Sequence, residues 1–277
     1  MRFASFIHEG KSGYGRVEGD AVLPPSAAFA AAYPSLKAAL AGAALARFEP
    51  GPAALPLAAL VFAPVIPDPA KILCIGQNYK AHGDGAGLPD HPPVFTRFAD
   101  TQAGHNAPIV IPAETGEFEL EGELALIIGR PGRAIPVAEA PAYVAGYCCY
   151  NDASARDWQS HSSQLVPGKN FPQTGGCGPF LVTPDEVGNP DDLALVSRVD
   201  GVVHQKARTA DMLFGTAALI AYVSRFTPLS PGDIIVTGTP ARTPAGEKPN
   251  SFLKPGSVVE IEIEKVGCLS NPLVAEG

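Results

Sequence analysis

Three glutamates occupy alternate positions in FELEGELALIIG, the segment that spans residues 118 to 129. They are Glu119, Glu121 and Glu123. The apolar second half of the segment predicts a β-strand, in which side chains alternate between faces, so the three carboxylates should share one face at a spacing of roughly 6.6 Å. At an effective dielectric constant near 20, neighbouring like charges at that spacing repel by roughly 2.5 kcal/mol. A bound divalent cation would turn this repulsion into coordination, because hard cations take carboxylate oxygens as ligands.

A simpler explanation is a strand with one face in water. Antiparallel strands commonly carry charged residues on the solvent face and bury the other face. On this segment alone, the metal site and the solvent-facing strand remain equally open.

Other catalytic motifs are missing from the sequence. GKS at 10 to 12 ends like a phosphate loop, but Ser5 stands where that loop needs its first glycine. GGCGPF at 175 to 180 lacks the third glycine of a dinucleotide fingerprint. There is no GxSxG, and the six histidines show no zinc-binding spacing. Nucleotide binding, zinc proteolysis and serine hydrolysis are therefore disfavoured.

Composition narrows the class of protein without naming a function. The chain has 277 residues, of which 46% are hydrophobic and 17% charged, which predicts a compact protein with a sizeable core. A net charge of −8 disfavours nucleic acid or an anionic membrane as a partner, but permits a small anionic substrate. The five cysteines form no CxxC pair, which favours a reducing compartment. With no signal-peptide pattern and no apolar run near ~18 residues, we expect a cytoplasmic protein.

The elements that must position the glutamates divide into two predicted domains. Residues 1–67 begin with strand-like pieces and continue into an alanine-rich helical segment that Pro34 interrupts. A proline-rich stretch follows, and we place the domain boundary near residue 68. Residues 68–277 contain many short apolar runs between glycine and proline turns, which predict strands. Residues 211–226 predict one helix, with Asp211 as its N-cap and Arg225 at its C-terminal end. The expected fold is mostly β with a few helices (α+β).

Several segments of the second domain carry a family resemblance. They occur in this order: IGQNYKAHGDG (75–85), FELEGELALIIG (118–129), GYCCYNDASARDWQ (146–159), PGKNF (167–171), CGPFLVT, DIIVTGTP and GCLSNPL. Together they resemble the fumarylacetoacetate hydrolase family over roughly residues 70 to 273. The resemblance implies a mixed β-roll catalytic domain over residues 68–277, a Mg²⁺ or Mn²⁺ site and a homodimer. It also implies action on 2-oxo acids, often acylpyruvates from aromatic-compound catabolism.

The resemblance assigns roles to individual residues. Its metal-binding motifs fall on Glu121, Glu123 and Asp152, whereas Glu119 is not carried over as a ligand. Three monodentate carboxylates would leave about three positions of an octahedral cation for water and substrate.

Four further residues match substrate-binding positions of the family. Lys169 would steady an oxyanion or exchange a proton, unless it is a surface lysine. Arg156 and Gln159 would hold a substrate carboxylate, although Arg156 could instead pair with Asp157 or another acid. Thr239 would bind the substrate through its hydroxyl and nearby amides, unless TGTP is only a tight turn.

A lid is also implied by the resemblance. His82 matches a family histidine that activates water, a role that suits an imidazole titrating near neutral pH. The family's partner glutamate falls on Gly85 here, so we predict that Asp84 takes its place. Glycines on both sides of Asp84 give the backbone the freedom that this substitution requires.

The leading functional hypothesis is a divalent-metal-dependent hydrolase that cleaves a C–C bond in an acylpyruvate-type 2,4-dioxo acid. A 2-oxo acid tautomerase or decarboxylase with an oxaloacetate-like substrate is the alternative, because all three reactions pass through a metal-stabilised enolate. A metal-binding β module without catalytic activity is the alternative from another class. The partner in every enzymatic case is a small anionic substrate.

Overall fold

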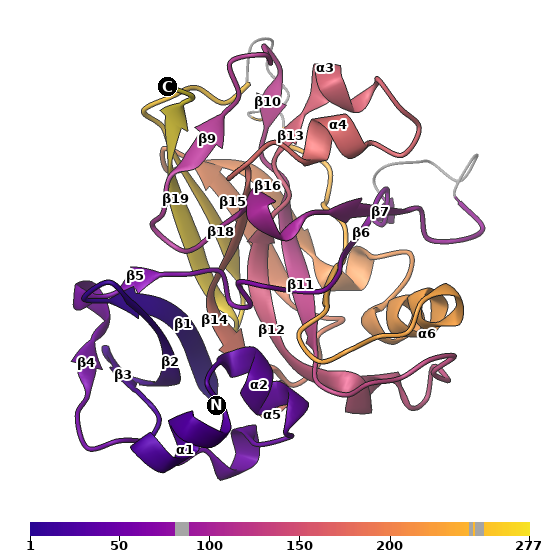
Figure 1. The fold of residues 1–277 in the computed structure, drawn as a ribbon. Coiled ribbons are helices and arrows are strands. Elements are labelled where there is room, and N and C mark those ends of the chain that lie inside the picture. The colour runs from indigo at the N-terminus through magenta and orange to yellow at the C-terminus, as the bar shows by residue number, and fades with distance from the viewer. Residues whose placement is uncertain (81–88, 244–245, 247–251) are drawn as a thin grey trace.

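The computed structural model describes residues 1–80, 89–243, 246 and 252–277. The N-terminal segment, drawn in indigo and violet in Figure 1, lies at one end of a larger body that is built mainly of strands. The expectation of a mostly β fold with a few helices is confirmed. Among the described residues, no helix is both long enough and apolar enough to cross a lipid bilayer.

A large mixed sheet runs through both parts of the molecule. Its strand order is β4-β3-β2-β1-β14-β12-β11-β17-β6-β7, with β5 paired to β1 and β8 paired to β14. The strands are β1 (Arg2–His8), β2 (Lys11–Glu18), β3 (Ala21–Leu23), β4 (Leu55–Pro56), β5 (Val61–Phe62), β6 (Ile72–Ile75), β7 (Val94–Arg97), β8 (Gln102–Ala103), β11 (Gly122–Ile128), β12 (Val144–Asn151), β14 (Gly175–Val182) and β17 (Ile234–Val236). Because β1 pairs antiparallel with β14, the N-terminal segment continues the sheet of the larger body.

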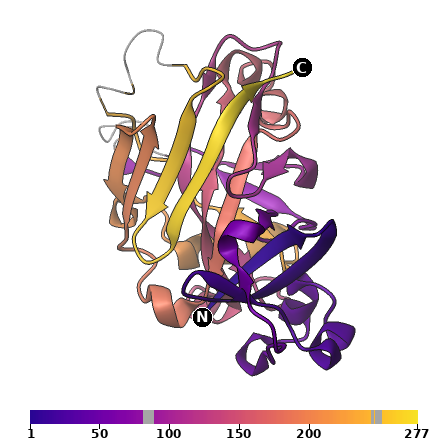
Figure 2. The same cartoon turned by 90° about the vertical axis from the view of Figure 1, so that its left-hand side faces the viewer.

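A second sheet has the order β16-β15-β18-β19-β9. Its strands are β9 (Ile109–Ile111), β15 (Ala194–Val199), β16 (Val202–Arg208), β18 (Val258–Ile263) and β19 (Gly267–Ala275). Figure 2 shows β18 and β19, in yellow, as a long antiparallel pair. A separate two-stranded ladder joins β10 (Phe118–Glu119) to β13 (Ser154–Ala155). This ladder matters for the site because it fixes the positions of Glu119 and the residues that follow β12.

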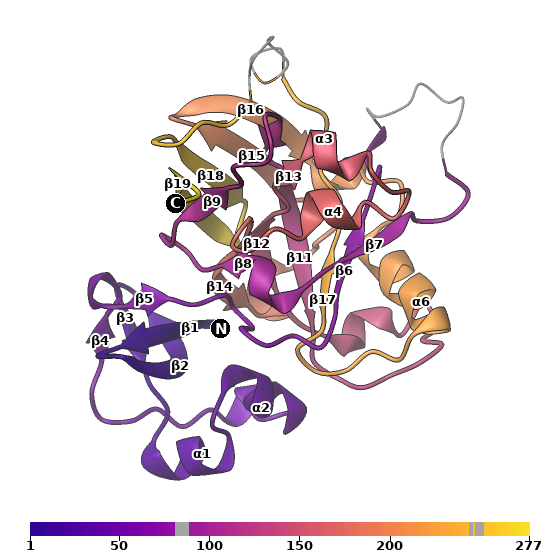
Figure 3. The same cartoon turned by 45° about the horizontal axis from the view of Figure 1, so that its top comes forward.

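Helices are short in the described parts of the chain. They are α1 (Ala27–Ala32), α2 (Leu36–Ala41), α3 (Arg156–Gln159), α4 (Val166–Lys169), α5 (Pro184–Val187) and α6 (Thr216–Phe226). Pro34 lies between α1 and α2, as predicted, because proline cannot continue a helix. Figure 3 shows α3 and α4 next to each other, close to β13 and β7.

The start of α6 differs from the sequence prediction. Asp211 is not its N-cap; it ends a short 3₁₀ helix and its carboxylate accepts a hydrogen bond from Arg208 N at 3.3 Å. The helix begins at Thr216, whose N–H donates to Asp191 Oδ1 at 2.9 Å. The capping carboxylate therefore comes from a loop distant in sequence, which local patterning could not identify. Arg225 lies in the last turn, as predicted.

Strand β11 contributes to two separate cores. Leu124, Leu126 and Ile128 pack into the core that contains residues of the second sheet and α6. Ala125 and Ile127 point the other way, into the core that contains α1 and α2. Because side chains alternate along a strand, Glu123 continues the second of these faces. The strand is therefore buried on both sides, and its carboxylates must find partners inside the protein.

Candidate active site

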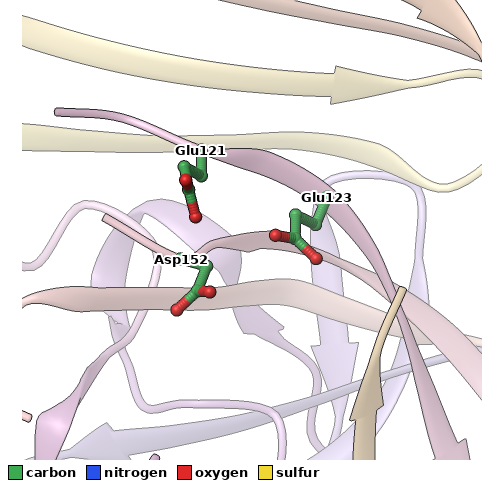
Figure 4. Close-up of side chains that lie close together, drawn as sticks. All are labelled: Glu121, Glu123 and Asp152. Carbon is green, nitrogen blue, oxygen red and sulfur yellow. The ribbon is translucent and has the colours of Figure 1, made fainter. Parts of the chain in front are cut away.

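Glu121, Glu123 and Asp152 come together at one end of the β11–β12 ladder. The register sets Glu123 opposite Tyr150, and Asp152 N–H donates to the carbonyl oxygen of Glu121 at 2.9 Å. One carboxylate oxygen from each of the three residues lies within 4.8 Å of the others, and all three residues are buried. Figure 4 shows their carboxylates turned toward a common space. The solvent-facing alternative is wrong, because Glu119 is also buried, at 5% exposure.

Lys169 lies among these acids and is not a surface residue. Its side chain is 2% exposed, and Nζ lies 2.5 Å from Glu121 Oε2 and 2.6 Å from Asp152 Oδ2. Nζ also sits 4.9 Å from the centre of the Phe95 ring, where a cation is favoured. Burial opposes the charged ammonium, but Asp152 and Glu121 raise the pKa of Lys169 above its usual value. The structure thus brings Lys169 to the carboxylates, where the sequence prediction expects it.

Gly168 explains how Lys169 reaches this position. A Cβ at residue 168 would lie 2.5 Å from both N and Cα of Gln159 and 2.6 Å from the carbonyl oxygen of Ala155. Only glycine permits that approach, so α4 packs directly on the backbone of α3. The contact of Gly168 with the backbone of α3 therefore sets the position of α4. Lys169, the next residue in α4, is positioned by the same contact.

Arg97 is a buried site residue that sequence analysis missed. Its Nη1 lies 2.7 Å from Asp152 Oδ1, and both side chains are fully buried. The same nitrogen donates to the carbonyl oxygen of Ala153 at 3.0 Å, while Nη2 donates to Thr174 Oγ1 at 2.7 Å. Arg97 thus holds one carboxylate oxygen of Asp152, and Lys169 holds the other. The arginine at the end of the short strand sequence VFTR was the available signal.

Glu123 differs from the other two acids because, among the described residues, no lysine or arginine lies within ion-pair distance of it. Its Oε2 accepts a short hydrogen bond from the backbone N–H of Gly238. Burial, together with the nearby Asp152 and Glu121 carboxylates, raises the pKa of Glu123 well above its usual value. Burial would also raise the pKa of Glu121, but Arg156 and Lys169 lower it to about 2.

The donor set fits a divalent cation. It offers three carboxylates, one of which has no cationic partner in the described structure, and hard cations such as Mg²⁺ and Mn²⁺ prefer oxygen ligands. A cation placed among these oxygens would supply the positive charge that Glu123 otherwise lacks.

Arg156 is held by the protein through all of its guanidinium nitrogens. Nε lies 2.7 Å from Glu119 Oε2, Nη1 donates to Gln159 Oε1 at 2.8 Å, and Nη2 forms a short ion pair with Glu121 Oε1. Asp157 instead accepts from Thr115 Oγ1 and from the N–H of Gly116. The observed partners of Arg156 are therefore Glu119 and Glu121, and its predicted contact with substrate stays a prediction, as does that of Gln159.

Glu119 also lies 2.7 Å from Arg242, through its Oε1. We call the ion-paired residues, together with Glu123, the charge cluster: Glu119, Glu121, Glu123, Asp152, Arg97, Arg156, Lys169 and Arg242. It contains four acids and four cations, so without a metal ion its formal charge is zero.

Gln205 connects the second sheet to the site and was also missed by sequence analysis. Its Oε1 accepts from the N–H of Gly122 at 2.9 Å, and its Nε2 donates to Thr239 Oγ1 and to the carbonyl oxygen of Pro240, each at 2.7 Å. Thr239 Oγ1 in turn donates to the carbonyl oxygen of Gly122 at 3.0 Å. The TGTP segment is thus a hydrogen-bonded wall of the site, and substrate binding by Thr239 stays a prediction.

A pocket of about 450 Å³ opens beside the carboxylates. Its walls include Glu121, Glu123, Lys169, Arg156, Gln159, Gln205, Thr239 and Arg242, with Ile75, Phe95 and Leu165 on the apolar side. A cavity of this size accommodates a small organic acid. The predicted lid residues His82, Asp84 and Gly85 lie outside the described residues.

Comparisons with known proteins identify the relatives of this chain. Residues 71–274 match the family described as fumarylacetoacetate (FAA) hydrolase C-terminal. A mitochondrial oxaloacetate tautomerase of Xenopus laevis is 42% identical over 213 residues, which cover 76% of this chain and 67% of that protein.

Solved structures are similar over the full length of the chain. A 2-hydroxyhepta-2,4-diene-1,7-dioate isomerase from Mycobacterium marinum has a TM-score of 0.81 at 30% identity, covering 100% of this chain and 99% of that one. A maleylpyruvate hydrolase from Sphingobium sp. SYK-6, solved in complex with manganese (II) ion and pyruvate, has a TM-score of 0.81 at 28% identity, with both chains fully covered. Isomerases and hydrolases therefore share this architecture.

Proposed function

This chain belongs to the fumarylacetoacetate hydrolase family, and we propose that it is a divalent-metal-dependent tautomerase of an oxaloacetate-type 2-oxo acid. The observation that carries the proposal is the position of Lys169 Nζ, 2.5 Å from Glu121 Oε2 and 2.6 Å from Asp152 Oδ2. This position supports a role for Lys169 as a proton carrier beside the predicted metal ligands. The names of relatives about 40% identical to this chain support the same reaction.

Tautomerisation moves one proton between C3 of the substrate and the oxygen on C2, with no net gain or loss of atoms. The metal ion, when bound by Glu121, Glu123 and Asp152, supplies electrophilic stabilisation of the enolate oxygen. Lys169 holds a proton at Nζ and exchanges it with the substrate. Arg97 and Arg156 orient Asp152 and Glu121, so the ligands keep their geometry while charge develops. These residue positions support the tautomerase proposal.

Hydrolysis of an acylpyruvate is the second candidate, and it makes a further demand. Cleavage requires an activated water in addition to a stabilised enolate. The candidate base, His82, and its candidate partner, Asp84, lie outside the described residues, and position 85 is glycine. The manganese-bound maleylpyruvate hydrolase of similar structure favours keeping this candidate. If this chain is an acylpyruvate hydrolase, we propose a role for it in aromatic-compound catabolism.

A substrate panel separates the candidates. The metal-loaded protein should accelerate the decay of the enol absorbance of oxaloacetate, with Mg²⁺ and Mn²⁺ compared side by side, and a chelator should abolish that rate reversibly. Release of pyruvate from acylpyruvates without enol decay would replace the tautomerase with the hydrolase, and release of CO₂ from oxaloacetate would indicate a decarboxylase. Metal binding by calorimetry with no turnover on any substrate would favour the non-catalytic β module.

Variants of the lid residues sharpen the choice between the two enzymatic candidates. In a hydrolase, His82→Ala and Asp84→Ala should each lower turnover by roughly 10²-fold, the usual scale of general base catalysis. The double variant should be little worse than either single one, because the two residues act in one step. In a tautomerase that relies on Lys169, neither substitution should change the rate of enol decay by more than a few-fold.

Two further proposals rest on the family and on composition. We propose a homodimer, which light scattering of the purified protein would test. We also propose a cytoplasmic location, which fractionation of the source cells would test; the tautomerase of Xenopus laevis is by its name mitochondrial.

A further inference from the structure

Arg242 lines the same pocket as Glu121, Glu123 and Lys169, yet the proposed reaction gives it no role. It lies two residues after the end of the TGTP segment, and a β-bridge to Gln205 fixes its backbone. Its side chain is 33% exposed, whereas that of Lys169 is 2% exposed. Arg242 is therefore a cation of the pocket wall that solvent, and hence a ligand, can reach.

Glu119 determines where the Arg242 guanidinium lies. The Glu119 side chain is 6% exposed; its Oε1 lies 2.7 Å from Arg242 Nη1 and its Oε2 lies 2.7 Å from Arg156 Nε. One buried carboxylate thus holds two guanidinium groups side by side. Arg156 also contacts the predicted metal ligand Glu121, whereas Arg242 lies on the other side of Glu119. The contacts therefore run from the predicted metal ligand Glu121 to Arg156, then to Glu119 and then to Arg242.

The two arginines differ in what they can still bind. Arg156 uses Nε, Nη1 and Nη2 for protein partners. The contacts of Arg242 with described residues both use Nη1, to Glu119 and to the carbonyl oxygen of Gly246 at 3.3 Å. The edge formed by Nε and Nη2 can therefore present two parallel donors, the arrangement that matches a carboxylate.

Charge balance points to the same ligand class. The charge cluster is formally neutral without a metal ion, so a bound divalent cation gives it an excess of two positive charges. A dianion neutralises that excess, whereas a monoanion leaves one charge uncompensated in a largely buried site.

We infer that Arg242 binds the second, distal carboxylate of a dicarboxylic 2-oxo acid, and that this contact selects dicarboxylic over monocarboxylic substrates. Glu119 is a positioning residue that holds Arg242 for this contact. The inference rests on the proposed function for the reaction, but its central claim concerns binding.

The test compares two unreactive 2-hydroxy acids that differ only in the distal carboxylate. Malate carries it and lactate does not, and calorimetry in the presence of Mg²⁺ measures each affinity. The wild type should bind malate more tightly than lactate. In Arg242→Met this preference should fall by about tenfold or more, the scale expected for losing hydrogen bonds to a charged group. Arg242→Lys should retain part of it, because it keeps the charge and loses the fork.

Arg198→Met is the matched control. Arg198 also forms an ion pair, with Glu262 at 2.7 Å, but it does not line the pocket. The preference of Arg198→Met for malate over lactate should equal that of the wild type. Thermal melting of each variant shows whether it is folded, and Glu119→Gln provides a second, milder variant that should lower the malate preference less than Arg242→Met does.

Activity gives an independent comparison. Arg242→Met should raise KM for the enolisation of oxaloacetate by about tenfold, whereas Arg198→Met should leave that KM unchanged. An unchanged ratio of malate to lactate affinity in Arg242→Met would overturn the inference, as would a wild type without preference for malate. Because these affinities require no turnover, a wild type that failed to tautomerise oxaloacetate would refute the proposed function alone.

Discussion

The segment from Phe118 to Ile128 comprises β10, β11 and the two residues between them. It is buried along its whole length, but its two halves are stabilised in different ways. In the second half, Leu124, Leu126 and Ile128 fill one core while Ala125 and Ile127 fill another. In the first half, Glu119 and Glu121 are buried as charges and depend on Arg156, Lys169 and Arg242. The two halves are therefore equally buried but differ in what stabilises them. Apolar packing stabilises the second half, and ion pairs stabilise the acidic half at the candidate active site.

The largest effect should come from the acidic half, at Glu123. Glu123→Gln should lower turnover by about a thousandfold or more and weaken Mn²⁺ binding, because the ion loses a charged ligand. The free energy of unfolding should change little, since no cation among the described residues pairs with Glu123. Calorimetry with Mn²⁺ and urea unfolding measure the two quantities. An unaltered Mn²⁺ affinity would show that Glu123 is not a metal ligand.

Lys169→Met should have the next largest effect. Turnover should fall by about a hundredfold or more, because the proton carrier beside Glu121 and Asp152 is lost. Mn²⁺ should still bind, since all three carboxylates remain. A rate within a few-fold of the wild type would mean that this lysine only balances charge in the acidic half.

Leu126→Ala tests the apolar half of the strand. The Leu126 side chain is fully buried, so its truncation should lower the free energy of unfolding by about 2–5 kcal/mol. Mn²⁺ affinity of the folded protein should stay within about twofold, as the cavity opens on the face away from Glu123. If metal affinity fell as steeply as stability, the two halves would not be separable.

Gly168→Ala should produce a smaller and more selective loss. The added Cβ would lie 2.5 Å from Gln159 Cα, so α4 must move and Lys169 must move with it. We expect kcat to fall roughly tenfold, because misplaced catalytic groups are costly, with Mn²⁺ affinity nearly unchanged. Gly116→Ala is the control, since a Cβ there meets nothing within 4 Å. Equal kcat values for the two variants would count against positioning by Gly168.

The smallest effect should come from a glutamate on another strand. Glu262 in β18 pairs with Arg198 but its side chain is 52% exposed. Glu262→Gln should change the free energy of unfolding by less than about 0.5 kcal/mol and leave turnover unchanged, because exposed ion pairs contribute little. Urea unfolding and the enol assay measure both. A larger effect would show that burial does not explain why substitutions of the glutamates in the acidic half have larger effects than substitution of Glu262.

The sequence predicted those site residues that lie in recognisable motifs, and it missed those that reach the site only through contacts distant in sequence. The family resemblance, carried by ELEGEL and NDASARD, assigned Glu121, Glu123 and Asp152 to one site. They meet because Glu121 and Asp152 flank the end of the antiparallel β11–β12 ladder, which also holds Glu123. Arg97 and Gln205 reach the site through other strands and pair with groups 55 and 83 residues away. No local pattern encodes such contacts, and the same reason explains the wrong N-cap assignment at Asp211.

The neutral charge cluster bears on how the protein matures in the cell. Many small metalloproteins cannot fold until their ion arrives, because metal binding supplies much of their folding free energy. Here Arg97, Arg156 and Lys169 already counter the charges of Asp152 and Glu121 in the folded chain. We therefore expect folding to come first and metal loading second. The supply of metal would then control how much of the folded protein is active and leave its abundance unchanged.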